Sequence, residues 1–248
     1  MLIAGVDLAA EPKGTAIAIM DWYAGAAKLV DLRLNVADQT IVEVALKVEK
    51  LGIDCAFGWP VEFVEFLLAN SRAKPSANAF DGDIEMRRRM AYRETDRQVH
   101  NVTGRWPLSV STDRLGMTAL RCAGLLSQIA ASGVEVDRAG SGRVVEIYPA
   151  ASLRIWGIDS TGYRASSEVR ASLLETLKHM APWLDLADYS SMMIDSCDAF
   201  DAVIAALATR AAALGKYIAP TESQLEVAQI EGWVALPTSP LAELSQTG

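Results

Sequence analysis

Two aspartates lie three residues apart in a helix-forming stretch that is otherwise rich in Ala, Val, Ile and Leu. In "DSCDAFDAVIAALATRAAALG" (195–215), Asp198 and Asp201 emerge on nearly one face of the expected helix. Asp198 also fits the role of helix N-cap, whereas Asp201 lies a turn further in, among apolar neighbours. Since buried carboxylates without a positive partner cost several kcal/mol, as an order of magnitude, the pair predicts a site that binds a cation.

Three more acids stand where apolar, strand-like runs end: Asp7, Asp54 and Glu146. Ligands of open α/β sheets bind at the carboxyl ends of the strands, so these acids are expected to converge with the helical pair. Each acid alone also fits a structural role. Asp7 could cap a turn, Asp54 could form an Asx turn, and Glu146 could pair with an arginine.

Oxygen ligands without neighbouring His or Cys favour Mg²⁺, Mn²⁺ or Ca²⁺ over Zn²⁺. Two such ions, about 3.5–4 Å apart, can activate a water and stabilise the leaving oxygen of a phosphodiester. Other chemistries have little support, because the chain holds only two histidines and lacks a Walker loop, GxGxxG and HExxH.

The elements that must position these acids follow from the apolar patterns. Three β-rich runs, "MLIAGVDLA", "TAIAIMDW" and "AAKLVDLRL", predict an antiparallel meander with the first strand central. A helix with Asp38 as N-cap, closing at Gly52, leads to the strand "IDCAF", parallel to the first. A fifth strand is expected in "RVVEIYP", and "EGWVALP" could be a last short one.

The prediction is therefore an α/β protein with a mixed five-stranded sheet, a β-β-β-α-β core flanked by helices. Residues 60–142 are expected to form a mostly helical insertion, with 1–248 as a single domain.

Composition limits the classes of function. A net charge of −8 argues against gripping nucleic acid mainly through counterion release. No apolar run approaches the roughly 20 residues of a membrane span, and three cysteines without CxxC spacing suggest reduced thiols. We therefore expect a soluble cytoplasmic protein without a membrane partner.

Basic residues outnumber acidic ones over 72–105, against the trend of the chain. Here Arg93, Asp96 and Arg97 are candidate substrate contacts, with Arg93 near a phosphate, and ion pairs on a solvated helix are the alternative. Trp59 and Trp106 are candidate stacking surfaces for nucleic acid, with core packing as the alternative.

The order of strands and acids resembles the ribonuclease H-like fold, and the helical "DAFD" resembles the closing motif of its Holliday-junction resolvase branch. More closely, the chain resembles the bacterial and archaeal domain-of-unknown-function family 429, described as predicted ribonuclease H-like nucleases. The motifs that carry this resemblance are "GVDLAAEPKGTAIAIMDW", "GIDCAFGWP", "YRETDRQV", "PLSVSTDRLG", "VVEIYPAASLRIWG", "CDAFDAVIAALATRAAALG" and "EGWVALP".

The resemblance implies site roles. Asp7 would bridge two metal ions, Asp54 would be the strand-four acid, and Asp201 with Asp198 would complete the set. Glu146 matches a family motif on strand five, away from the superfamily's usual second acid.

The sequence thus predicts a hydrolase, a Mg²⁺- or Mn²⁺-dependent nuclease or phosphodiesterase acting on nucleic acid or a nucleotide. One alternative is an ATP-binding phosphotransferase of the sugar-kinase, heat-shock and actin type, with "AGVDLAAEPKGTAIAI" as phosphate loop. Such proteins need two domains, and the chain has room for little more than one. The other alternative is a catalytically silent binding module on the same fold.

Overall fold

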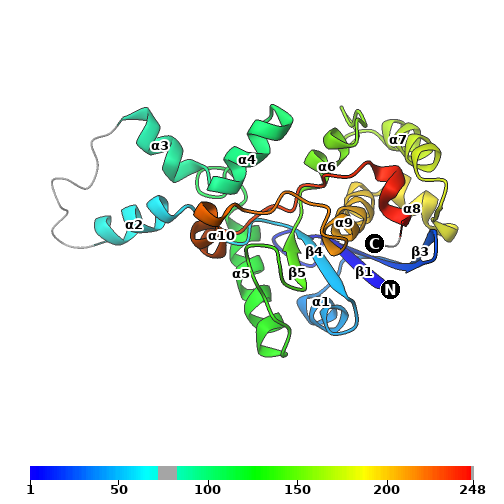
Figure 1. Ribbon diagram of the computed structural model, residues 1–248, viewed down its shortest axis with the longest axis horizontal. Coiled ribbons are helices and arrows are strands. Elements are labelled where there is room, and N and C mark those ends of the chain that lie inside the picture. Colours follow the sequence, from blue (N-terminus) through cyan, green and yellow to red (C-terminus); the bar gives the residue numbers. More distant parts are fainter. Residues whose placement is uncertain (72–82, 247–248) are drawn as a thin grey trace.

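The computed structural model describes residues 1–71 and 83–246, and a mixed sheet lies at its centre (Figure 1). Its order is β5-β4-β1-β2-β3-β6. The predicted meander is confirmed, since β2 pairs antiparallel with both β1 and β3, and β4 runs parallel to β1 as predicted. The strands are β1 (Leu2–Asp7), β2 (Ala16–Tyr23), β3 (Ala26–Leu34), β4 (Lys50–Asp54), β5 (Val144–Glu146) and β6 (Leu184–Asp185).

The prediction of five strands is wrong, because the sheet of the described residues has a sixth. Strand β6 has only two residues, paired with Ala27 and Lys28 of β3, and is too short to leave a periodic pattern in the sequence. Conversely, "EGWVALP" contributes two isolated bridges, Val234 with Glu146 and Pro237 with Tyr217, rather than a strand.

Helices cover both faces of the sheet (Figure 1). Helices α6 to α9 pack on one face and α1 and α5 on the other, each over its own apolar core. No helix among the described residues has the length and hydropathy that spanning a bilayer requires. The α-helices are α1 (Asp38–Ala45), α2 (Val61–Asn70), α3 (Ile84–Ala91), α4 (Glu94–Thr103), α5 (Gly116–Ala131), α6 (Pro149–Ile155), α7 (Ser167–Met180), α8 (Ser190–Asp195), α9 (Cys197–Ala213) and α10 (Leu225–Glu231), with short 3-10 turns at Ala187–Tyr189, Glu222–Gln224 and Leu241–Ser245.

Helix α9 lies unusually close to the sheet. A Cβ atom built on Gly5 of β1 would lie 2.1 Å from the backbone nitrogen of Ala206. One built on Gly52 of β4 would lie 1.9 Å from Oγ1 of Thr209. Glycine is therefore needed at both strand positions, because any side chain would push the helix away.

Gly52 also corrects the predicted end of the first helix. Helix α1 ends at Ala45, and Gly52 lies inside β4, so this glycine serves strand-to-helix packing rather than helix termination. The N-cap is Ala37, and Asp38 is the first helical residue.

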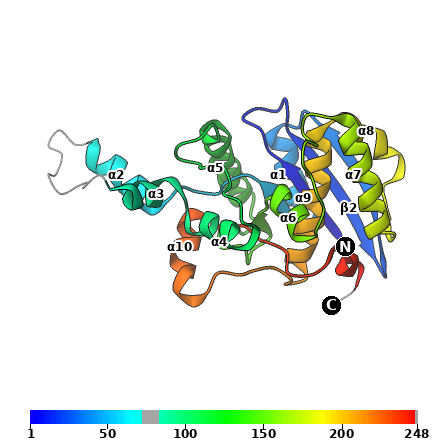
Figure 2. The same cartoon turned by 90° about the horizontal axis from the view of Figure 1, so that it is seen from above.

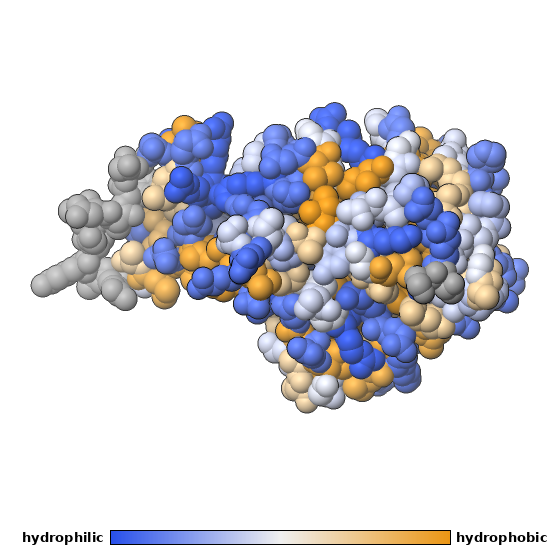
Figure 3. Space-filling view, viewed as in Figure 1, coloured by the Kyte–Doolittle hydropathy of each residue, from blue (hydrophilic) through white to orange (hydrophobic). Residues whose placement is uncertain are grey.

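Among the described residues, the stretch over 60–142 holds α2 to α5, and its part over 83–100 is divided into two helices. Tyr92 and Arg93 adopt extended backbone angles between α3 and α4. Figure 2 shows α2 and α3 projecting from the body, and Figure 3 shows hydrophobic side chains gathered over α2. Residues 72–82, the first part of the basic segment, lie outside the described residues.

Gly5→Ala is expected to destabilise the fold by about 1–3 kcal/mol, because overpacking forces α9 away from β1. Urea unfolding followed by circular dichroism measures this cost. Gly124→Ala in α5 is the matched control, since a Cβ there meets nothing within 4 Å and should be neutral or stabilising. Equal effects of the two changes would contradict the close approach.

Candidate functional site

Asp7 and Asp54 end neighbouring parallel strands side by side. They are register partners in the β1–β4 pair, so both side chains point to the face covered by α9. Both are partly buried. No described residue donates a hydrogen bond to either carboxylate, in contrast to most buried acids.

Helix α9 brings Asp198 and Asp201 to the same place. Ser196 is the N-cap, since its Oγ accepts the backbone N–H of Ala199 at 3.2 Å. Asp198 therefore lies inside the first turn, and the N-cap role considered for it is not the observed one. We refer to Asp7, Asp54, Asp198 and Asp201 as the carboxylate cluster.

Asp201 is 2% exposed and is held by its neighbours. The hydroxyl of Tyr163 donates to Oδ1 at 2.7 Å, and the thiol of Cys197 donates to Oδ2 at 3.6 Å. Nη2 of Arg164 forms a looser ion pair with Oδ2 at 3.5 Å. The position of Asp201 beside the strand ends agrees with the expectation for an acid on an apolar helix.

The cluster brings four carboxyl groups together with one guanidinium, that of Arg164. Burial, together with the negative charges of Asp54, Asp201 and Asp198, raises the pKa of Asp7 to about 9. Burial, followed by the charge of Asp201, raises the pKa of Asp54 well above its usual range. The pKa values of Asp198 and Asp201 are also raised, chiefly by burial. The positive charge of Arg164 opposes all four shifts.

A cavity of about 410 Å³ opens beside the cluster. Its polar lining includes Asp7, Asp54, Tyr148 and Arg164. Arg164 gives no signal in the sequence, because it stands in the polar turn "STGYRASS" before α7 and no spacing links it to the acids. Only the fold brings this turn to the strand ends.

Glu146 belongs to a second arrangement. Its register partner on β4 is Ile53, so its side chain points to the opposite face from Asp54 and Asp7. There Arg93 binds it bidentately, Nη2 to Oε1 at 2.7 Å and Nη1 to Oε2 at 2.9 Å. The arginine pairing considered for Glu146 is the observed one.

Arg93 and Asp96 complete this buried ion-pair network. Arg93 is 4% exposed, and its guanidinium also donates to both Asp96 oxygens and to the Glu231 carbonyl. These contacts use all five N–H donors of the guanidinium. Arg93 therefore has no donor left for a substrate phosphate, although the network borders the same cavity.

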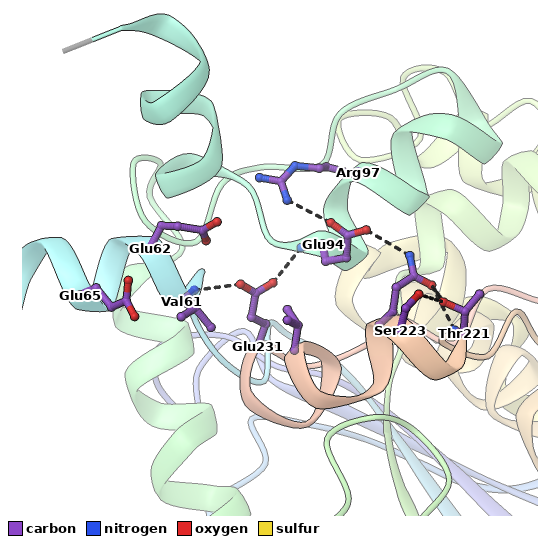
Figure 4. Close-up of a pocket in the computed structure, with 10 residues that line it drawn as sticks. Val61, Glu62, Glu65, Glu94, Arg97, Thr221, Ser223 and Glu231 are labelled. Atoms are coloured by element: carbon purple, nitrogen blue, oxygen red, sulfur yellow. Dashed lines mark hydrogen bonds and ion pairs between the residues drawn. The ribbon is translucent and has the colours of Figure 1, made fainter. Parts of the chain in front are cut away.

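Arg97 faces another cavity, of about 560 Å³ (Figure 4). It pairs with Glu94 at 3.1 Å, as expected for an ion pair on a helix. Glu231 accepts the backbone N–H groups of Val61 and Glu94 at 2.8 and 2.7 Å, and so satisfies the first residues of α2 and α4. This cavity lies where α2 and α4 of the insertion meet α10.

The two candidate stacking residues differ. Trp106 is 45% exposed, so core packing does not describe it, and its ring lies against His100 and Tyr92 at centroid distances of 4.2 and 4.3 Å. Trp59 is partly buried.

Within residues 1–71 and 83–246, no group of three or more His, Cys, Asp or Glu side chains is already arranged to hold a metal ion. The composition of the cluster nevertheless fits a hard divalent cation, since its acids supply oxygen ligands and excess negative charge. The contacts that hold Asp201 to Tyr163, Cys197 and Arg164 keep its oxygens engaged with the protein.

Fold and site together define an α/β protein with a carboxylate-lined cavity at the carboxyl edge of a mixed sheet. The chain belongs to the family described as Protein of unknown function (DUF429), whose model matches residues 5–224. Comparison with curated proteins and with solved structures gave no match.

Asp7→Asn is expected to stabilise the metal-free protein increasingly from pH 5 to pH 9. The pKa of an unfolded aspartate is about 3.9, and that of Asp7 is about 9. The contribution of the Asp7 carboxyl to wild-type stability is complete below about pH 3.9 and is lost as the pH rises through about 9. At pH 8 the gain should be at least about 1 kcal/mol.

Urea unfolding in EDTA at several pH values measures this trend. Glu49→Gln, at an exposed position, is the control and should show no such dependence. A loss of stability in Asp7→Asn at every pH would contradict the charge excess.

Arg93→Met is expected to cost about 3–5 kcal/mol, because it leaves Glu146 and Asp96 buried without their counter-charge. Glu146→Gln should cost less, since Arg93 keeps Asp96. Arg88→Met removes an exposed ion pair with Glu85 and should cost at most about 1 kcal/mol. Thermal unfolding of the three variants ranks them, and equal costs for Arg93→Met and Arg88→Met would be the contrary result.

Proposed function

We propose that this protein is a metal-dependent hydrolase of phosphodiesters, a nuclease or phosphodiesterase that uses Mg²⁺ or Mn²⁺ at the carboxylate cluster. One observation carries the proposal. Asp7 and Asp54 stand in register on one face of the sheet, next to buried Asp201, without a hydrogen-bond donor from the described residues. Buried carboxylates without hydrogen-bond donors need a nearby cation to be stable in the ionised form.

The ligand set that we propose is Asp7, Asp54, Asp201 and Asp198. Asp7 is its central member, because its pKa responds to the charges of the other three. Glu146 falls outside the set, since Arg93 and the backbone N–H of Phe57 occupy its oxygens. Binding of the metal ion requires Arg164 to leave Asp201. The side chain of Arg164 is 60% exposed, so it has room to move.

The protein's own groups have separate tasks in such a reaction. Bound divalent ions would supply an activated water and neutralise the leaving oxygen. Arg164, released from Asp201, is placed to donate to a phosphate oxygen at the cavity. Tyr163 holds Asp201 in position through its hydroxyl.

We also propose that the fold is ribonuclease H-like. The support is the antiparallel meander followed by a helix and a strand parallel to the first, with acids at the ends of β1 and β4. A short sixth strand at the β3 edge adds to this core without interrupting it. Nucleic acid or a nucleotide is the substrate that this fold would imply.

A catalytically silent binding module is the second candidate. It is favoured by the lack, among the described residues, of three acidic or thiol side chains already set to hold an ion. A module of this kind would keep the acids as part of a binding cavity and hydrolyse nothing.

Isothermal titration with Mn²⁺ distinguishes the two. Wild type should bind the ion and hydrolyse at least one of a panel of single-stranded, duplex and branched oligonucleotides or small phosphodiesters. Asp7→Asn should lose at least about tenfold in Mn²⁺ affinity and most of the activity. Asp188→Asn, at an exposed position, is the matched control and should change neither. Equal Mn²⁺ binding by wild type and Asp7→Asn, or none by wild type, would rule the metal site out.

A further inference from the structure

The cavity beside the carboxylate cluster has two kinds of lining. Charged and polar groups include Arg164 and Tyr148 beside the sheet edge, and the paired Arg93 and Asp96 of the insertion. Apolar groups come from the strand ends, as with Leu8 and Ile147, and from the insertion, where Pro107, Leu108 and Leu115 precede α5. Leu108 is 49% exposed, so it offers apolar surface that a ligand could cover. A molecule that fits both linings must itself have a charged and an apolar part.

The size of the cavity limits the ligand. At about 410 Å³ it lies in the range of small-molecule sites, which hold about 300–1,000 Å³. A long duplex would instead need an extended basic surface, and the chain has a net charge of −8. The dimensions and the charge both favour one nucleotide-sized unit.

Arg164 supplies the recognition of the charged part. Its Nε–H donates to the Tyr163 hydroxyl at 3.3 Å, its guanidinium lies over the Tyr163 ring at 5.8 Å, and it forms the ion pair with Asp201 at 3.5 Å. The other N–H donors have no partner among the described residues. A guanidinium with free donors at a cavity wall is suited to a phosphate, which it binds with two parallel hydrogen bonds.

We propose that this cavity binds a single nucleotide-sized phosphoester, with its phosphate at Arg164 and its ring against Leu108 and Leu115. The inference rests on the proposed function and names the substrate class of the same site. The insertion then acts as a specificity element, because Leu108 and Leu115 supply the apolar wall that the ring would contact.

Isothermal titration of the full chain in Mn²⁺ compares three probes: AMP, ribose 5-phosphate, which lacks the ring, and adenosine, which lacks the phosphate. AMP should bind at least about tenfold more tightly than either fragment. Leu108→Ser should weaken AMP by about five- to tenfold and leave ribose 5-phosphate unchanged. Arg164→Gln should weaken AMP and ribose 5-phosphate but not adenosine.

Leu120→Ser is the matched control, since Leu120 is 61% exposed on α5 and does not line the cavity. It should bind all three probes as wild type does. Because both leucines are exposed, neither change should affect folding, and circular dichroism checks this.

The inference is overturned if AMP and ribose 5-phosphate bind equally and Leu108→Ser alters neither. It is also overturned if a single-stranded oligonucleotide of about 20 residues binds more than about tenfold tighter than AMP, independently of Leu108. Mn²⁺ binding and hydrolysis without AMP binding would reject this inference alone. If wild type binds no Mn²⁺, the proposed function fails, and the same titrations without metal still decide whether AMP binds through Leu108.

Discussion

The close approach of α9 to β1 and β4 fixes where the carboxylates meet. Gly5 and Gly52 have no side chain that would separate helix and sheet, and the facing side of the helix has small residues such as Ala206. As a result, Asp201 is carried onto the ends of two parallel strands, where Asp7 and Asp54 already stand in register. The acids are buried there because the backbones pack closely. The stability of the whole fold therefore offsets the free-energy cost of burying them.

Two neighbouring groups of acids differ in the hydrogen bonding of their carboxylate oxygens. In the network of Arg93, Asp96 and Glu146, every carboxylate oxygen has a donor inside the protein. In the carboxylate cluster, Asp7 and Asp54 have none among the described residues, and Arg164 is the shared positive neighbour. The first arrangement stabilises the joint between insertion and sheet. The second raises the pKa values of its acids, and acids with raised pKa values beside a cavity mark a candidate functional site.

The sequence was sufficient to predict the meander, the parallel β4 and the meeting of Asp7, Asp54 and Asp201, because strand ends and helical spacing are local patterns. It could not place Glu146, since a shift of one register position turns a side chain to the other face. Arg164 was out of reach because its role depends on a turn folding back across the sheet. Strand β6 has only two residues, a single period of strand alternation, which is too little to show a pattern in the sequence.

The central claim is that the carboxylate cluster holds a divalent cation. A crystal grown with Mn²⁺ and measured near the manganese absorption edge tests it most directly. We expect an anomalous difference peak within coordination distance of a carboxylate oxygen of Asp7, with Arg164 turned away from Asp201. A peak only at other carboxylates, or none in wild-type crystals while Arg164 still pairs with Asp201, would contradict it.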